Sequence, residues 1–228
     1  MIGVYDSGSG GLTALSHLLR LAPCADICYL GDLPHAPYGT KTRAELIPII
    51  EENTLRFLAL GAEHILVACV TASSLYSHLS PKTQSHLYPI TFAISDACAM
   101  RTRTGRVGIV STTRTMREGV IKGLLTHRGL TPTESSADAL VLLAERGLTS
   151  PEHPEVRDAI KKACLVHQAA DVDTLILGCT HFPLFRTAFA EQMGEGVALI
   201  DSGREGALAF LQSISKDVLA GRGQVHFI

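Results

Sequence analysis

The chain has 228 residues, which is enough for one large α/β domain or two small ones. Hydrophobic residues make up 46% of it and charged residues 18%, a balance typical of a folded protein with a core and not of a disordered chain. With 20 Lys and Arg against 22 Asp and Glu, the net charge of -2 gives no general electrostatic reason to bind nucleic acid or an anionic membrane, and we expect neither as a partner.

The chain also lacks the usual signals for a membrane or for secretion. No uninterrupted apolar stretch approaches the roughly 18 residues of a membrane helix. Residues 1–6 lack the basic start and the long apolar run of a signal peptide. We therefore expect a cytoplasmic protein whose six cysteines are thiols and not disulfides.

Short β-branched runs alternate with longer helical patterns along the first half of the chain. The expected strands cover residues 1–5, 27–30, 64–68 and 89–94. The expected helices cover residues 12–21, 44–60 and 71–79, and Pro48 limits the first turn of the second helix or kinks it.

The second half of the chain repeats this scheme. The expected strands cover residues 106–110, 174–178 and 197–200, and the expected helices cover residues 115–128, 137–146 and 154–169. Strands that alternate with helices indicate an α/β protein with parallel sheets covered on both faces.

A weak internal repeat indicates two similar α/β units. In the first half one strand ends at Asp6-Ser7 and a later one at Cys69; in the second half one ends at Ser111-Thr112 and a later one at Cys179. Each unit would then place a hydroxyl-rich turn and a cysteine at the carboxyl end of a strand, where open α/β sheets bind ligands. Chance repetition of common βα units is the alternative.

Two of the six cysteines lie in a context that suits chemistry. Cys69 and Cys179 each follow an apolar strand and precede a threonine and the start of an expected helix. The helix dipole and the free N–H groups at such a position lower the pKa of a thiol from about 8.5 toward neutrality, so we expect a lowered pKa for both. The other four cysteines, at positions 24, 28, 98 and 164, are expected to be small buried hydrophobic residues, and that role stays open for the two singled out.

The pattern of cysteines and histidines does not predict a metal site. Cys24 and Cys28 form one closely spaced pair without a second pair, and the ten histidines are scattered. A redox pair of Cys69 and Cys179 is disfavoured because the two lack the Cys-x-x-Cys spacing. We expect no metal.

Two loops and one histidine are further candidates. The glycine-rich turn at residues 6–11 leads from a strand into a helix and is either a simple turn or an anion site suited to a carboxylate. Residues 37–39, Pro-Tyr-Gly, form a second loop after a strand, with Asp32 and His35 upstream. His181 lies two residues after Cys179 and either tunes that thiol or has a structural role.

Several blocks of the sequence together resemble glutamate racemase. They are Ile2-Gly-Val-Tyr-Asp-Ser-Gly-Ser-Gly-Gly-Leu-Thr13, Tyr29-Leu-Gly-Asp32 followed by Pro37-Tyr-Gly39, Val67-Ala-Cys-Val-Thr-Ala-Ser73, Leu175-Ile-Leu-Gly-Cys-Thr-His-Phe-Pro-Leu184 and Leu199-Ile-Asp-Ser202. The blocks follow the order of the family and cover nearly the whole chain. The Gly-Cys-Thr-His block together with the Asp-Ser-Gly start is the specific part of the resemblance.

The resemblance implies a fold and a domain division. The fold is α/β, with two pseudo-symmetric, doubly wound parallel-sheet domains and the active site in the cleft between them. We expect residues 1–95 to form the first domain, completed by a C-terminal helix within residues 203–228, and residues 96–202 to form the second, with 100–105 as the joint.

The resemblance also implies an activity and its residues. The family racemises an amino acid, so the expected partner is a small-molecule amino-acid substrate. The reaction needs no pyridoxal phosphate, metal or other cofactor. A homodimer is possible, with a monomer as the alternative. Cys69 would remove the α-proton of the D-enantiomer and Cys179 that of the L-enantiomer. The supporting acid–base groups would be Asp6, Glu145 and His181. The expected substrate contacts are Asp6, Ser7, Pro37, Tyr38, Gly39, Val70, Thr71, Thr180 and His181.

The chain departs from the family at a few positions. Val70 replaces an asparagine, which removes a hydrogen bond to the substrate and typically costs about 1–3 kcal/mol. Ile94-Ser95-Asp96 replaces the usual Ile-Glu-Pro, and Ala137-Asp138 replaces Cys-Pro. The chain is also shorter than typical members.

Four hypotheses remain open at this point. The leading one is a glutamate racemase that supplies D-glutamate for peptidoglycan. The others are a racemase of another amino acid such as aspartate, a degenerate racemase that binds ligand with little turnover, and a cysteine hydrolase with a histidine base.

Overall fold

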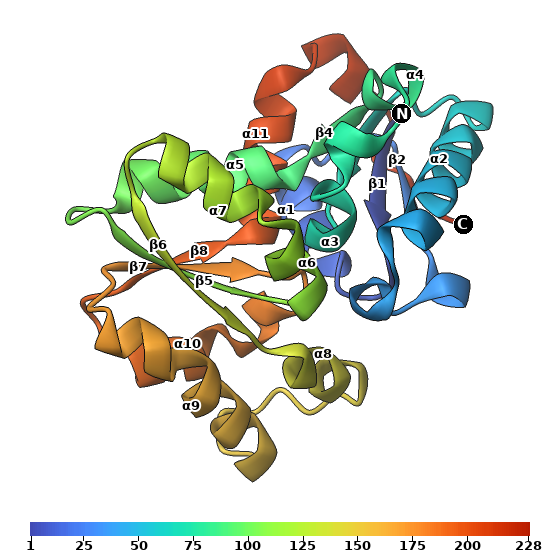
Figure 1. Ribbon diagram of the computed structural model, residues 1–228. Helices are drawn as coiled ribbons and strands as arrows, with labels where there is room; N and C mark the ends of the chain where they lie inside the picture. Colours follow the sequence, from blue (N-terminus) through green and yellow to red (C-terminus); the bar gives the residue numbers. More distant parts are fainter.

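The computed structural model describes all residues, 1–228, and contains two parallel β-sheets (Figure 1). The strands of the first sheet are ordered β4-β3-β1-β2-β9, and those of the second β6-β5-β7-β8. Every strand pairing is parallel. The predicted α/β class with two parallel-sheet domains is therefore confirmed.

The two sheets share one topology. The first consists of β1 (Ile2–Asp6), β2 (Ile27–Gly31), β3 (His64–Val67), β4 (Leu87–Pro89) and β9 (Val225–Phe227). The second consists of β5 (Arg106–Ser111), β6 (Thr131–Ser136), β7 (Thr174–Gly178) and β8 (Ala198–Asp201). In each sheet the first strand of the unit lies between the second and the third, so β1 corresponds to β5 and β3 corresponds to β7.

Helices cover the sheets, as parallel strands buried on both faces require. Those of the first half are α1 (Leu12–Leu21), α2 (Arg43–Ala59), α3 (Val70–Ser73), α4 (Pro81–Gln84) and α5 (Ile90–Arg101). Those of the second half are α6 (Thr113–Glu118), α7 (Val120–His127), α8 (Asp138–Glu145), α9 (Pro154–Ala169), α10 (Arg186–Met193) and α11 (Ser202–Ser213). In Figure 1, α5 and α7 lie on one face of the second sheet and α9 and α10 on the other. None of the helices is both long and apolar enough to cross a membrane.

Three of the predicted elements are wrong in part. The strand expected at 89–94 ends at Pro89, and Ile90 begins α5, because Ile90, Ile94, Ala97 and Cys98 form one buried helical face. A short apolar run does not distinguish a strand from a buried helix. The helix expected at 71–79 is a single turn, α3, followed by a 3-10 turn at Tyr76–His78.

The serines in this segment explain why α3 is short. The Ser73 hydroxyl donates to the Val67 carbonyl at 2.8 Å and accepts from the Ile90 amide at 2.9 Å. Side-chain hydroxyls that bind backbone groups in this way compete with helical hydrogen bonds.

The helix expected at 115–128 is divided in two at Gly119. That residue has a φ of 67°, which ends α6 in the left-handed conformation that glycine adopts readily. Strand β6 was not predicted, because its residues Thr131–Ser136 are polar and only partly buried at the edge of the sheet.

The C-terminal region and the domain boundary complete the fold. The helix expected within 203–228 ends at Ser213, and after a 3-10 turn at Lys216–Leu219 the chain adds β9 to the first sheet beside β2. Helix α5 packs Ile90 and Ile94 against Val107 and Ile176 of the second sheet. The domain boundary at residue 95 stays a prediction.

Candidate active site

A cavity of about 300 Å³ lies at the carboxyl ends of the central strands of both sheets. It is lined by 19 residues, eight of them hydrophobic. The lining includes the sequence-predicted residues Ser7, Pro37, Tyr38, Gly39, Cys69, Val70, Thr71, Glu145, Cys179, Thr180 and His181. Asp6 is fully buried and hydrogen-bonds Thr180, a residue of the lining. The structure therefore brings together all the predicted catalytic and substrate-contact residues, whereas Asp32 and His35 do not line the cavity.

The two cysteines reach the cavity from equivalent places in the two sheets. Cys69 follows β3 and precedes α3, and Cys179 follows β7 directly. Both are buried, with exposed fractions of 4% and 8%. The Cys69 thiol lies 3.5 Å from the Ser7 hydroxyl oxygen, to which it can donate. The repeat detected in the sequence thus corresponds to two thiols at one cavity.

The pKa of each thiol is raised, contrary to the expected lowering. Burial raises the pKa of Cys69 to about 12, and the nearby Asp6 carboxylate adds to the shift. Burial likewise raises the pKa of Cys179 well above its ordinary value, with Cys69 and Asp6 contributing. Removal from water penalises the thiolate more than the backbone N–H groups stabilise it.

Asp6 connects the two halves of the site. Its Oδ1 atom accepts from the Gly8 amide at 3.0 Å, and its Oδ2 atom accepts from the Thr180 hydroxyl at 3.1 Å. Burial raises the pKa of Asp6 to about 6, although the charge of His181 and these hydrogen bonds act in the opposite direction. A carboxyl group with this pKa changes its protonation close to physiological pH.

His181 lies between a thiol and a carboxylate. Its Nδ1 atom is 3.8 Å from the Cys179 sulfur, and its Nε2 atom is 2.5 Å from the Glu145 Oε1 atom. Glu145 also accepts from the Ser9 hydroxyl at 3.0 Å. This chain of groups can move a proton between Cys179 and the edge of the cavity.

Close approach of the two halves depends on Gly10. A Cβ atom at this position would lie 2.5 Å from the Thr180 hydroxyl oxygen and 2.7 Å from the His181 ring. Such distances are too short for any side chain, so glycine in the turn before α1 allows the second half of the site to pack against the first.

Tyr38 presents its hydroxyl to a buried polar network. The hydroxyl donates to Asp32 at 2.5 Å and is hydrogen-bonded to Tyr5, while Asn53 donates to Asp32 at 3.1 Å. Burial raises the pKa of Tyr38. This network holds Tyr38 in place and so helps to fix the loop of Pro37 and Gly39.

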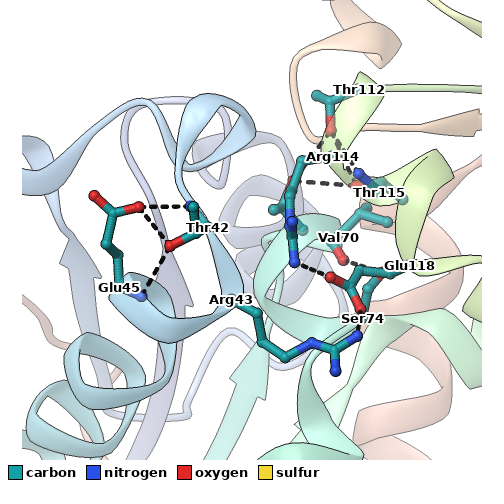
Figure 2. A network of polar contacts seen from close by, with 10 residues as sticks. Thr42, Arg43, Glu45, Val70, Ser74, Thr112, Arg114, Thr115 and Glu118 are labelled. Atoms are coloured by element: carbon teal, nitrogen blue, oxygen red, sulfur yellow. Dashed lines mark hydrogen bonds and ion pairs between the residues drawn. The ribbon is translucent and has the colours of Figure 1, made fainter.

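Helix α6 contacts the first half of the molecule at both of its ends (Figure 2). At its start, the hydroxyls of Thr112 and Thr115 lie 3.3 and 3.1 Å from the Thr71 hydroxyl. At its end, the buried Glu118 carboxylate accepts from Arg43 of α2 at 2.8 Å and pairs with Arg114 of α6 (Figure 2). We refer to Arg43, Arg114 and Glu118 as the α6 ion-pair cluster.

Val70 lies on the cavity wall with its side chain in an apolar cluster. It packs with Ile90 and Ile94 of α5 and is 2% exposed. The carbonyl of Val70 accepts from the Ser74 hydroxyl at 2.9 Å (Figure 2). An amide at this position, as the resembling family has, would therefore lie at the border between the cavity and a hydrophobic core.

Charged groups at the cavity are almost all acidic. Asp138 and Glu145 line it, and the lining contains no lysine or arginine. No group of three or more His, Cys, Asp or Glu side chains is arranged to hold a metal ion. Any anionic group of a ligand must therefore be held by backbone amides, hydroxyls or His181.

Comparison with known proteins assigns the chain to a family. The model of the Asp/Glu/hydantoin racemase family matches residues 19–209, which is most of the chain. The chain belongs to this family. Its family and its fold make the protein an isomerase.

Individual relatives agree with this assignment. The chain is 34% identical to the glutamate racemase of Corynebacterium kroppenstedtii over 209 residues, 90% of this chain and 71% of that protein. The crystal structure of the glutamate racemase isoform RacE1 from Bacillus anthracis is 30% identical and has a TM-score of 0.88, over 100% of this chain and 86% of that one. The glutamate racemase of Thermus thermophilus, solved in complex with beta-chloro-D-alanine, is 32% identical and has a TM-score of 0.84, over 99% and 86% of the two chains.

Sequence reasoning missed three polar residues of the cavity, Thr40, Thr112 and Asp138. Thr112 follows β5, and its position at a strand end was visible in the sequence although it was not named as a site residue. Asp138 follows β6, and because that strand was not recognised, nothing in the pattern placed Asp138 at a carboxyl end.

Proposed function

We propose that this chain is a cofactor-independent glutamate racemase that interconverts L- and D-glutamate with two cysteines. The observation that carries the proposal is that Cys69 and Cys179 line one cavity from equivalent ends of two related sheets. Relatives and solved structures at 30% identity or more bear the name glutamate racemase. We further propose that it works in the cytoplasm and supplies D-glutamate for peptidoglycan.

The proposed reaction removes the α-proton from one face of the α-carbon and adds a proton to the opposite face. With L-glutamate, the Cys179 thiolate takes the α-proton, the bond electrons stay on the α-carbon, and the Cys69 thiol gives its proton to the opposite face. Cys69 ends as the thiolate and Cys179 as the thiol, so the overall charge is unchanged. D-glutamate reacts in the reverse direction.

Surrounding groups support these steps. His181, held by Glu145, can accept the proton that Cys179 must lose before it acts as a base. Asp6 and Ser7 are positioned near Cys69 and are proposed to bind the substrate ammonium group. A positive charge there would favour the thiolate, which burial alone disfavours.

Backbone groups and hydroxyls are proposed to hold the carboxylates of the substrate. On one wall Tyr38 and Gly39 are proposed to donate backbone amides, since the Tyr38 hydroxyl binds Asp32, while Pro37 has no amide N–H and makes only van der Waals contact. On the other walls the proposed contacts are Val70, Thr71 and Thr180. Preorganised donors in a site shielded from water stabilise the charge that develops at the α-carbon.

The test is α-proton exchange into deuterated water with Cys69→Ser and Cys179→Ser variants. Both variants should lose racemisation by at least a factor of about 100, because each lacks one of the two acid–base groups. Cys179→Ser should still exchange the α-proton of D-glutamate, and Cys69→Ser that of L-glutamate. Absence of exchange in the wild-type protein, with a known racemase active in parallel, would refute the proposal.

A cysteine hydrolase is the second candidate, favoured by one observation. Cys179, His181 and Glu145 are arranged as a nucleophile, a base and an orienting carboxylate. A hydrolase would need only Cys179, so Cys69→Ser would leave its activity intact. The same pair of variants therefore separates the two functions.

The oligomeric state belongs to the proposal as well. A homodimer stays a prediction, and sedimentation velocity over a range of protein concentrations would test it. A single monomeric species at all concentrations would exclude it.

A further inference from the structure

Asp138 is a charged residue on the cavity wall that the proposed mechanism does not use. It is the first residue of α8 and lies where the resembling family usually has proline. Both of its carboxylate oxygens lie 3.1 Å from the Thr113 amide nitrogen, and Oδ2 accepts from the Thr113 hydroxyl at 2.5 Å. Three hydrogen-bond contacts to one residue hold the carboxylate in a fixed place.

The carboxylate lies beside the wall that is proposed to contact the substrate. A Cβ atom built on Gly39 would be 3.7 Å from the Asp138 Oδ1 atom and 3.6 Å from the Thr112 Cβ atom. Gly39, Thr112 and Asp138 all line the cavity. A substrate group that approaches the Gly39 amide therefore also approaches the Asp138 carboxylate.

No cation neutralises this carboxylate. Its hydrogen-bond partners are the neutral amide and hydroxyl of Thr113, and it takes part in no ion pair. The lining of the cavity has no lysine or arginine, and the imidazole of His181 is engaged by Glu145. The negative charge of Asp138 thus acts directly on a ligand in the cavity.

We propose that Asp138 is a specificity-determining residue that lowers the preference of the enzyme for an anionic side chain over its uncharged amide counterpart. This inference rests on the proposed function, since it concerns the substrate of the same site. A fixed carboxylate repels a second carboxylate at short range and accepts a hydrogen bond from a carboxamide. Glutamate is therefore bound less well than the rest of the cavity allows, whereas glutamine is not disfavoured.

The inference is tested by the ratio of kcat/KM for L-glutamate to kcat/KM for L-glutamine, measured by α-proton exchange. The Asp138→Asn variant keeps an acceptor oxygen for Thr113 but removes the charge. We expect the ratio to rise about tenfold, a discrimination typical of one charge contact in a binding site. A ratio that stays unchanged, or an equal fall in activity on both substrates, would overturn the inference.

Two further variants make the result independent of folding and of net charge. Asp138→Pro restores the residue usual in the family, which suits the first position of a helix, and should shift the ratio in the same direction. Asp158→Asn removes one charge from an exposed site on α9, where the carboxylate pairs with Lys162, and should leave the ratio unchanged.

A binding measurement separates failure of this inference from failure of the proposed function. If no amino acid undergoes exchange while a known racemase does, the proposed function fails. Titration calorimetry with glutamate and glutamine then still gives the ratio of the two Kd values. In Asp138→Asn, the Kd for glutamate should fall about tenfold relative to the Kd for glutamine if the inference holds. An unchanged ratio would overturn it.

Discussion

The buried thiols Cys69 and Cys179 show how strongly the environment of a residue controls its chemistry. Each lies at the start of a helix or turn, yet burial and the Asp6 carboxylate raise both pKa values, that of Cys69 to about 12. Both thiols are therefore protonated at neutral pH. Under the proposed mechanism, a cationic group of the substrate favours the thiolate form.

Asp6 offers a test of these electrostatics through stability. Its pKa of about 6 in the folded protein lies above the ordinary value of 3.8, so the folded state binds more protons between these two pH values, and stability falls as the pH rises through them. We expect Asp6→Asn to raise the free energy of unfolding by about 2–3 kcal/mol near pH 7.5. Near pH 3.5 the gain should vanish.

Thermal denaturation followed by circular dichroism at both pH values measures this difference. Asp158→Asn serves as the control, because its carboxylate is exposed and should give no pH-dependent gain. An Asp6→Asn protein that is equally destabilised at both pH values would show that the hydrogen bonds of Asp6 outweigh its burial.

At the scale of elements, helix α6 is one of the connections between the two halves around the cavity. It has only six residues, but its start contacts Thr71 and its end contacts Arg43, both of the first half. The loop of Pro37–Gly39 directly precedes the Arg43 region in the chain and lies against Thr112 in space. The α6 ion-pair cluster therefore helps to hold that loop against the second half.

We expect Glu118→Gln to raise KM about tenfold with little change in kcat, because the cavity wall loses part of its anchoring and the acid–base groups are untouched. The change leaves Arg43 and Arg114 without their carboxylate, and the free energy of unfolding should fall by roughly 3 kcal/mol. Steady-state kinetics and chemical denaturation measure the two effects.

Glu45→Gln is the matched control for Glu118. Glu45 is an exposed carboxylate of α2 that forms a capping box with Thr42 (Figure 2). Glutamine can also close a capping box, so this replacement should change stability little and leave KM unchanged. If Glu118→Gln changed stability but not KM, the α6 ion-pair cluster would have no role in positioning the wall.

At the scale of the whole molecule, the chain passes from the first sheet to the second through the turn at residues 102–105. Asp173, which precedes β7, organises this turn by accepting from the Thr102 hydroxyl and from the amides of Arg103 and Thr104, each at 2.7 Å. Burial alone would raise the pKa of Asp173, but these hydrogen bonds outweigh it and hold the pKa well below the ordinary value.

Asp173→Asn is therefore expected to lower the Tm by roughly 5 °C near neutral pH, as the loss of charged hydrogen bonds in a protein of this size implies. Because the pKa of Asp173 is depressed in the folded protein, its ionised carboxylate stabilises the fold above the ordinary pKa of an aspartate. This stabilisation is lost as the pH falls. The difference in Tm should thus narrow below about pH 4.

The neighbouring Asp171 provides the control for this prediction. It is exposed and pairs with Arg106 at 2.6 Å, an interaction that contributes little at the surface. Asp171→Asn should leave the Tm nearly unchanged. Equal effects of the two variants would mean that the turn at 102–105 does not depend on Asp173.

The sequence alone predicted the class of the fold from local patterns along the chain, and its resemblance to a known family predicted the candidate site residues. Alternating apolar runs predicted the parallel sheets, and Cys69 and Cys179, which each follow a strand, were expected at the carboxyl edges of these sheets. The elements that escaped prediction, β6 and the start of α5 at Ile90, lack a distinctive local pattern.

Only the tertiary structure decided the electrostatics and the contacts between the two halves. The raised pKa of Cys69 follows from burial, which local sequence does not reveal. The hydrogen bond of Thr180 to Asp6 and the position of Asp138 beside Gly39 join residues far apart in the chain. Such effects depend on how the two sheets pack together, because the loss of water around a charged group and its distance from other charges exist only in the folded molecule.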